Sequence, residues 1–273
     1  MAEQFRHPGI KQVIAIASGK GGVGKSTTAV NLALALVGIG YRVGLLDADI
    51  HGPNQPHMLG TMNQQPATDA SQKLYPVERY GLQTMSIAYL IDAETPVIWR
   101  GPMVGSALQQ LFYDTQWQDL DYLIIDLPPG TGDVQLTLAQ KIPLAGAVIV
   151  TTPQDVALLD VRKAIAMFNK VKVPILGVVE NMALHTCSQC GHQEAIFGEQ
   201  GAKTLAQEFG ITLLGSLPLN KIIREHVDQG KPTVVADPDS ALTQNYLDMA
   251  RSVVSNVEEV VKRAKRFPKI VVE

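Results

Sequence analysis

The stretch Gly19-Lys20-Gly21-Gly22-Val23-Gly24-Lys25-Ser26 decides the expected fold. Its outline, Gly-x-x-x-x-Gly-Lys-Ser, is the Walker A pattern, in which glycines let consecutive backbone N–H groups point at phosphate groups. In this pattern Lys25 adds a cation at the β- and γ-phosphates, and the Ser26 hydroxyl is a ligand for Mg²⁺. An aliphatic run precedes the loop and an amphipathic segment follows it, as expected for a loop that joins a strand to the N-terminus of a helix. We therefore expect a site for ATP with Mg²⁺.

Outward from this loop, short aliphatic runs alternate with longer segments of helical periodicity. We expect strands at 12–17, 42–47, 82–88, 122–126, 147–151, 175–180 and 212–216, and helices at 25–39, 106–112, 134–141, 158–171, 201–209 and 241–264. This alternation predicts an α/β fold: a single P-loop NTPase domain over residues 1–273, with a mostly parallel central sheet and helices on both faces. Residues 60–80 are polar and show few periodic cues, so we expect a loop insertion there.

The composition narrows the functional classes. Aromatic residues make up only 5% of the chain, so the core must be mainly aliphatic, as in buried parallel strands. A net charge of −3 argues against general nucleic-acid binding. No stretch approaches the roughly 18 apolar residues of a membrane helix, and the first apolar run is too short for a secretory signal. We expect a cytoplasmic protein with no nucleic-acid or membrane partner.

Two acidic segments complete the expected nucleotide site. Asp47 and Asp49 follow an aliphatic run, and Asp126 follows another in the form of a Walker B segment. Open α/β sheets bind ligands at the carboxyl ends of their strands, and a Walker B carboxylate holds the Mg²⁺ shell. The plainer alternative for Asp47 and Asp49 is a structural cap at the strand end. A dinucleotide-binding loop would lack the Gly-Lys-Ser ending, and a metabolite kinase would have no need of Lys20.

Cys187 and Cys190 are the only cysteines of the chain, in a Cys-x-x-Cys-Gly arrangement typical of half a tetrahedral metal site. Either His185 and His192 complete a zinc site within one chain, or a second subunit supplies two more thiolates. Four thiolates from two chains suit zinc or a [4Fe–4S] cluster equally well by count. A thioredoxin-like dithiol is disfavoured, because that motif opens a helix and Gly191 would interrupt it.

Several separate segments resemble the Mrp/ApbC iron–sulfur cluster carrier ATPases. The second lysine of the loop, Lys20, is similar to the deviant Walker A lysine of the MinD/ParA and nitrogenase iron protein class, to which those carriers are related. The resembling segments are 17–27 (ASGKGGVGKST), 47–53 (DADIHGP), 99–103 (WRGPM), 121–133 (DYLIIDLPPGTGD), 180–182 (ENM), the Cys187/Cys190 pair, 196–198 (IFG) and 223–225 (IRE). The resemblance covers residues from about 12 to 235.

The resemblance implies a homodimer that binds and slowly hydrolyses ATP and transfers an iron–sulfur cluster to apo iron–sulfur proteins. It implies that Lys20 reaches the partner's nucleotide, that Asp49 positions the attacking water and that Asn181 contacts the adenine. The implied catalytic residues are Lys20, Lys25 and Asp49; the nucleotide-binding residues are Gly19, Lys20, Gly21, Gly22, Val23, Gly24, Lys25, Ser26, Thr27, Asp126 and Asn181; the metal ligands are Ser26 for Mg²⁺ and Cys187 and Cys190 for a [4Fe–4S] cluster that bridges two subunits.

Three alternatives share some of these features. A positioning ATPase of the MinD/ParA type, with zinc at the cysteines, would have the same loop but also a membrane helix or a basic DNA-binding face. The basic segment 262–269 is a small patch and is better explained as a solvated helix end. An electron-donating reductase like the nitrogenase iron protein would need a cysteine near Asp126, where there is none. The third alternative is a metal-ion chaperone, which the two cysteines alone do not exclude.

Overall fold

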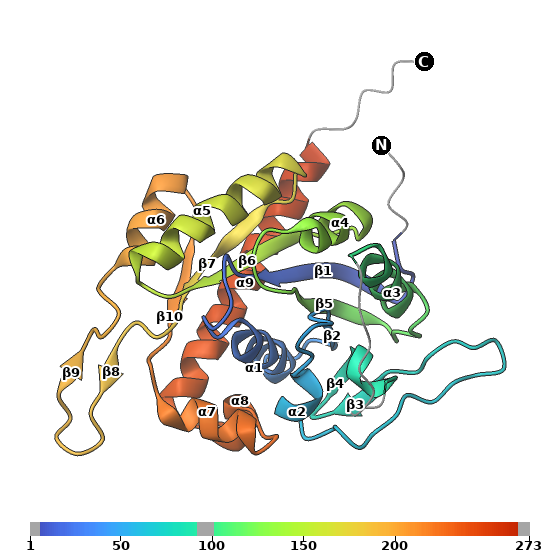
Figure 1. Ribbon diagram of the computed structural model, residues 1–273, viewed down its shortest axis with the longest axis horizontal. Helices are drawn as coiled ribbons and strands as arrows, with labels where there is room; N and C mark the ends of the chain where they lie inside the picture. Colours follow the sequence, from blue (N-terminus) through green and yellow to red (C-terminus); the bar gives the residue numbers. More distant parts are fainter. Residues whose placement is uncertain (1–5, 92–100, 267–273) are drawn as a thin grey trace.

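In the part of the chain that the structure describes, an eight-stranded sheet runs in the order β10-β7-β6-β1-β5-β2-β4-β3 (Figure 1). This computed structural model describes residues 6–91 and 101–266, without the side chains of residues 101, 102 and 264–266. The strands are β1 (Ile10–Ala17), β2 (Val43–Asp47), β3 (Val77–Arg79), β4 (Leu82–Ser86), β5 (Leu120–Asp126), β6 (Gly146–Thr151), β7 (Ile175–Glu180) and β10 (Leu213–Ser216). All neighbours pair in parallel except β3 and β4.

The helices cover both faces of this sheet. Figure 1 shows α3 (Gly101–Tyr113), α4 (Asp133–Lys141), α5 (Asp155–Lys170) and α6 (Gly201–Phe209) on one side; α1 (Lys25–Gly38), α2 (Gln55–Met58), α7 (Lys221–Asp228), α8 (Thr233–Ala236) and α9 (Ala241–Arg266) lie on the other. A short 3₁₀ helix, η1 (Ile87–Tyr89), follows β4. The expected α/β fold, with a mostly parallel sheet between two helical layers, is confirmed.

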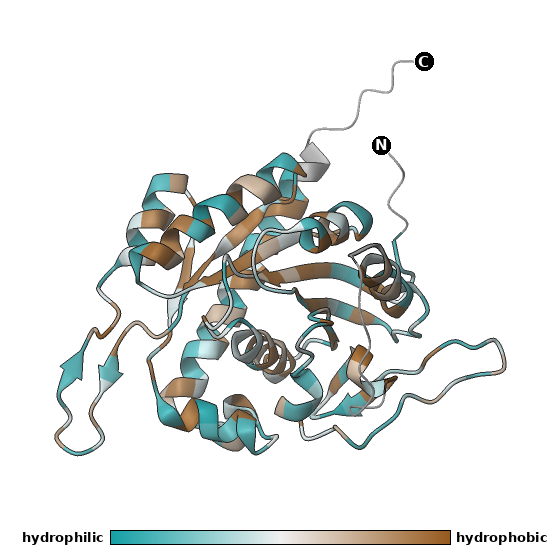
Figure 2. Ribbon diagram, in the orientation of Figure 1, coloured by the Kyte–Doolittle hydropathy of each residue, from teal (hydrophilic) through white to brown (hydrophobic). Residues whose placement is uncertain are grey.

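Alternation along β1 divides the core into two halves. Val13 and Ala15 pack in the cluster that includes residues of α3 to α6, whereas Ile14 and Ile16 pack in the cluster that includes α1 and α9. Because both faces of β1 are buried, the strand is apolar at every position of this run, and Figure 2 shows brown strands at the centre of the molecule. The sheet is therefore a rigid platform, and the loops at its edges are the places left for chemistry.

The register of the central strands aligns their carboxyl ends. Strand β5 lies between β1 and β2, with Asp126 level with Ile16 on one side and with Asp47 on the other. The loop after β1 contains the Gly-x-x-x-x-Gly-Lys-Ser motif. The register therefore brings the motif and both acidic segments together at the carboxyl ends of β1, β2 and β5, which we call the carboxyl edge of the sheet. Segments far apart in the sequence meet there because parallel strands must all end on the same side.

The sequence-based interpretation was wrong at several places. Residues 60–80 contain β3 at their end, an antiparallel edge strand that pairs with β4. The strand expected at 82–88 ends at Ser86, where the chain turns into η1, and α3 begins before the expected residue 106. Three-residue strands and single-turn helices such as α2 and α8 have too few residues to produce a periodic signal.

A small hairpin, β8 (His185–Thr186) and β9 (Gln193–Glu194), extends from the body between β7 and α6 (Figure 1). At the other end of the chain, α9 has i, i+4 ion pairs from Lys262 to Glu258 and from Arg263 to Glu259. From residue 267 onward, the basic segment 262–269 lies outside the described residues. Across residues 6–91 and 101–266, no helix has both the length and the apolar content that a membrane crossing requires.

Candidate functional site

Two glycines shape the loop between β1 and α1. Gly22 and Gly24 have φ values of 80° and 81°, in the left-handed region that a residue without a Cβ atom enters at little cost. Gly24 is the residue before Lys25, the first residue of α1, and no side chain caps that helix end. The helix therefore presents its backbone N–H groups and its positive dipole end to the loop, an arrangement suited to phosphate.

Neighbouring segments hold the loop tightly. Nδ2 of Asn181, just after β7, donates a hydrogen bond of 2.8 Å to the carbonyl oxygen of Val23. A Cβ atom on Gly24 would overlap that same Nδ2 atom, and one on Gly19 would lie 2.5 Å from the carbonyl carbon of Asp160 in α5. The loop glycines are thus required both for backbone conformation and for close contact with Asn181 and with α5. Asn181 lies against the loop, and its expected contact with adenine stays a prediction.

The charged groups expected at the site come together at the carboxyl edge. Nζ of Lys25 lies 2.5 Å from Oδ1 of Asp126, 3.2 Å from Oγ of Ser26 and 4.0 Å from Oδ2 of Asp49. Asp126 is fully buried and Lys25 is 6% exposed, so this ion pair is shielded from water. Burial raises the pKa of Asp49, and the positive charge of Lys25 opposes that rise. The arrangement places one cation and two carboxylates beside the start of α1.

Asp47 faces a different set of partners. Its Oδ2 accepts hydrogen bonds of 3.1 Å from the backbone N–H groups of Asn54 and Gln55, and its Oδ1 accepts one of 3.2 Å from Asp49. Burial, together with the nearby negative charge of Asp126, raises the pKa of Asp47 to about 7. Asp47 therefore holds the backbone of the segment that follows β2. It lies beside Asp126 and forms no ion pair with Lys25.

Sequence reasoning missed Gln55, which is 2% exposed. Its Nε2 donates hydrogen bonds to Oδ2 of Asp126 at 2.9 Å and to the carbonyl oxygen of Ser26 at 3.1 Å. The one available signal was Pro56, because proline favours the first turn of a helix and so marks the start of α2. Nothing in the local pattern indicates that this glutamine reaches two other segments of the chain.

The oxygen groups at this edge fit Mg²⁺. The Ser26 hydroxyl and the Asp126 carboxylate are hard oxygen donors, and Oε1 of Gln55 is a buried acceptor with no partner among the described residues. Mg²⁺ bound with a nucleotide usually takes one or two carboxylates together with phosphate oxygens and water, so a cage made only of protein is not needed. In the described part of the chain, no three His, Cys, Asp or Glu side chains form such a cage.

The two cysteines lie at the turn of the β8–β9 hairpin. The turn is closed by hydrogen bonds of 2.9 Å from the N–H of Cys187 to the carbonyl of His192 and from the N–H of Gly191 to the carbonyl of Cys187. Cys190 is exposed and Cys187 half-buried. Hydrogen bonds from the backbone N–H groups of Cys190 and Gln189 lower the pKa of the Cys187 thiol. This favours the thiolate, the form that binds metal.

Lys20 differs from Lys25, the other lysine of the loop. It is half-buried and makes no ion pair with any residue that the structure describes, whereas Lys25 contacts two carboxylates. Thr27 lies in the first turn of α1, at the position after Ser26. Of the segments that carry the family resemblance, Trp99 and Arg100 lie outside the described residues.

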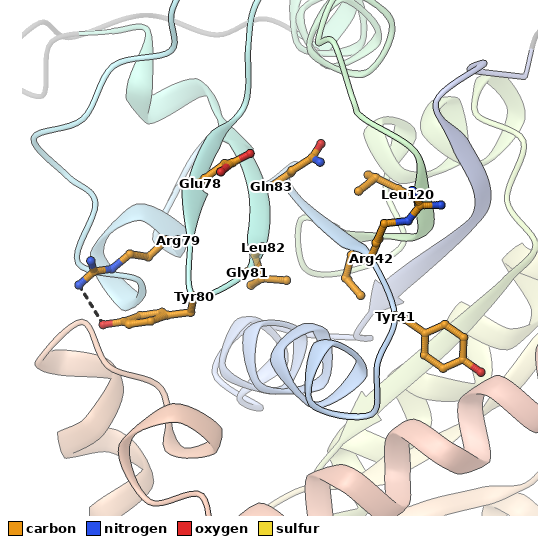
Figure 3. Close-up of a pocket in the computed structure, with 10 residues that line it drawn as sticks. Tyr41, Arg42, Glu78, Arg79, Tyr80, Gly81, Leu82, Gln83 and Leu120 are labelled. Carbon is orange, nitrogen blue, oxygen red and sulfur yellow. Dashed lines mark hydrogen bonds between the residues drawn. The ribbon is translucent and has the colours of Figure 1, made fainter.

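A hollow of about 390 Å³ lies at the opposite edge of the sheet, at the amino ends of β2 and β4 (Figure 3). Most of the polar side chains that line this hollow already have partners within the protein. The Arg42 guanidinium faces Asp119 and Asp121, and the Gln83 amide bonds to the backbone of Gln118. Arg79 stacks on the ring of Tyr80, 4.3 Å from its centre, and also donates to its hydroxyl. This hollow therefore lies at the opposite ends of the strands from the Gly-x-x-x-x-Gly-Lys-Ser loop and the two acidic segments.

Comparisons with known proteins agree with this geometry. The family model described as NUBPL iron-transfer P-loop NTPase, of the ParA group, matches residues 9–254. A protein of Pseudomonas fragi named iron-sulfur cluster carrier protein is 59% identical over 242 residues, which cover 88% of this chain and 84% of that protein.

Solved structures show the same fold. A nucleotide-binding protein from Archaeoglobus fulgidus in complex with ADP has a TM-score of 0.74 and 38% identity, covering 85% of this chain and 90% of that one. The cell division ATPase MinD of Pyrococcus furiosus has a TM-score of 0.69 at 23% identity, covering 89% of this chain and 98% of its own, a likeness of fold alone. The matched length and the identity to the carrier protein lead to one conclusion: the chain belongs to the NUBPL iron-transfer P-loop NTPase family.

Proposed function

We propose that the protein is an ATP-dependent carrier that binds an iron–sulfur cluster at Cys187 and Cys190 and transfers it to apo iron–sulfur proteins in the cytoplasm. The observation that carries the proposal is the β8–β9 hairpin. It holds two accessible thiols at its turn, and no third ligand lies with them in the described part of the chain. Such a half-site suits a cargo that must be bound and released. Family membership and the name of the Pseudomonas relative support this reading.

The active unit in this proposal is a homodimer. Two thiols satisfy only half of a [4Fe–4S] cluster, so two hairpins would have to face one cluster. Lys20 has no carboxylate partner among the described residues, which leaves its ammonium group free to reach the nucleotide of a second copy. A cation from a partner subunit would stabilise the charge that develops on the transferred phosphoryl group, as an arginine finger does.

In the proposed ATPase reaction each residue has a separate role. The N–H groups of residues 19–27 and the ammonium of Lys25 bind the phosphates, and Ser26 and Asp126 would hold Mg²⁺. When bound, Mg²⁺ supplies charge neutralisation at the β- and γ-phosphate oxygens. Asp49 orients the attacking water from its place 4.0 Å from Lys25. We propose slow hydrolysis that is coupled to cluster binding or release.

A short path connects the two sites. Asn181 holds Val23 of the nucleotide loop, and only five residues separate Asn181 from Cys187. A shift of the loop on nucleotide binding would therefore reach the base of the hairpin directly. We propose that ATP changes how firmly the two subunits hold the cluster between them, since affinity at one site is linked reciprocally to affinity at the other.

Anaerobic reconstitution with iron and sulfide tests the proposal. We expect a coloured dimer with about four irons, or roughly two per chain, as one [4Fe–4S] cluster requires. Transfer is then measured by adding an apo iron–sulfur protein, with and without ATP. A colourless protein with about half a zinc ion per chain would overturn the carrier function and favour a positioning ATPase with structural zinc. The proposal that the protein binds and hydrolyses ATP would survive that result.

A further inference from the structure

Gln55 is a buried side chain at the nucleotide site that the motifs do not account for. It lies at the start of α2, eight residues after Asp47, and its backbone N–H donates to Oδ2 of Asp47. Its side-chain nitrogen bonds to Oδ2 of Asp126 at 2.9 Å and to the carbonyl of Ser26 at 3.1 Å. One residue therefore joins the ends of β2 and β5 to the first turn of α1.

The two residues that the amide contacts are those that would hold Mg²⁺. Asp126 would supply a carboxylate and Ser26 a hydroxyl, and their separation must suit the octahedral geometry that Mg²⁺ demands. Lys25 occupies Oδ1 of Asp126, so Gln55 holds the other carboxylate oxygen and fixes the rotation of the whole group. The hydrogen bond to the Ser26 backbone holds the serine at the same time.

The chemistry of an amide suits this task. A lysine at position 55 would place a second cation on Asp126 and compete with a metal ion there. A glutamate would add a carboxylate beside Asp47 and Asp126, where charge repulsion is already present. The amide nitrogen donates without a net charge, and the unpartnered Oε1 can accept a hydrogen bond from a metal-bound water. Groups around metal ligands commonly act this way.

We propose that Gln55 is a positioning residue that sets the geometry of Ser26 and Asp126 for Mg²⁺. The inference rests on the nucleotide-binding part of the proposed function and is independent of cluster transfer. Affinity for the nucleotide without metal should depend on the loop and Lys25. Affinity of the protein–nucleotide complex for Mg²⁺ should depend on Gln55.

The test measures binding of a fluorescent ADP analogue to the full chain, first in EDTA and then across a MgCl₂ titration. The variants are Gln55→Met, which is close in volume but makes no such hydrogen bonds, and Gln55→Asn, which keeps the amide but shortens its reach. Gln244→Leu is the matched control, because that exposed glutamine also donates to a carboxylate, at 2.8 Å from Asp248. Thermal unfolding without nucleotide establishes which variants are folded.

We expect the Mg²⁺ concentration at half-saturation to rise about 10-fold or more in folded Gln55 variants, as is typical for loss of a partner to a metal ligand. Affinity for the analogue in EDTA should stay at the wild-type value, and Gln244→Leu should match wild type in both. An unchanged Mg²⁺ midpoint, or an equal loss of affinity in EDTA and in Mg²⁺, would overturn the inference. A wild-type protein that binds no nucleotide in either condition would instead contradict the ATP-dependent function.

Discussion

The ammonium nitrogen of Lys25 lies 2.5 Å from Oδ1 of Asp126, and both side chains are almost completely shielded from water. Residues 101 positions apart in the chain thus form a buried ion pair at the centre of the carboxyl edge. Asp49 lies farther from the same nitrogen, at 4.0 Å, and is more accessible. Asp126 is thus held in a buried ion pair, whereas Asp49 keeps some exposure, which suits the role in orienting water that we propose for it.

Lys25→Ala and Asp49→Ala should therefore have different consequences. Lys25→Ala should abolish tight ATP binding and also lower stability, because an unpaired buried charge costs about 3–5 kcal/mol. Asp49→Ala should bind ATP and lose about 10²- to 10⁴-fold in turnover, the usual contribution of a positioned acid–base group. Equilibrium binding, turnover and urea unfolding should be measured for each. Normal turnover in Asp49→Ala would remove its proposed role.

The two left-handed glycines of the loop offer a matched comparison. Each should cost about 1–2 kcal/mol on substitution by alanine, because an L-residue is strained at this φ. A Cβ at Gly22 meets nothing within 4 Å, whereas one at Gly24 overlaps Asn181. Gly24→Ala should therefore weaken nucleotide binding much more than Gly22→Ala. The double variant Gly24→Ala with Asn181→Ala should recover part of the difference; no recovery would mean that Asn181 is not the cause.

Mixed dimers test whether Lys20 acts on the partner subunit. Homodimers of Lys20→Ala and of Lys25→Ala should both be inactive in hydrolysis. In a mixed dimer, the site with an intact Lys25 would receive an intact Lys20 from the other subunit, so turnover should return to about half of the wild-type value per dimer. Differently tagged chains allow the mixed species to be purified. A mixture as inactive as its parents would contradict action between subunits.

Substitution of either thiol should separate the two sites. Cys187→Ser and Cys190→Ser should lose the iron and the visible absorbance obtained on reconstitution, because each removes one of the ligands that a cluster needs. Affinity for ATP should change little, since the loop is held by Asn181 and Asp126 rather than by the hairpin. Ser188→Ala, between the two cysteines, is the control and should bind iron normally. Iron retained by both serine variants would place the cluster elsewhere.

Asp47 should make stability depend on pH. Its pKa is raised in the folded state from 3.8 to about 7, so the folded protein binds the proton more tightly than the unfolded chain does. The free energy of unfolding should then fall as pH rises through this window. Asp47→Asn should lack this decline, and urea unfolding at several pH values would measure the difference. An Asp239→Asn control removes an exposed charge and should follow the wild-type curve; parallel curves for all three proteins would contradict the assignment.

The sequence by itself determined the architecture and which charged residues come together at the carboxyl ends of the central strands. The aliphatic runs can be recognised because strand segments buried on both faces are apolar, as at residues 13–17 of β1, and the glycines at positions 22 and 24 allow the left-handed backbone of the loop. The convergence of Asp47, Asp49 and Asp126 also followed, because parallel strands end on one edge. These features depend on short-range patterns or on one general rule of topology.

Only the tertiary structure decided which groups outside the motifs complete the site. Gln55 reaches Asp126 and Ser26, and Asn181 holds Val23 across 158 positions of the chain. The β3 strand exists only because β4 offers it an edge, since three residues have no stable extended form of their own. Contacts of this kind depend on how far and in which direction a side chain extends once the sheet is assembled. Local periodicity contains no information about that distance, which is set by the packing of helices and strands around it.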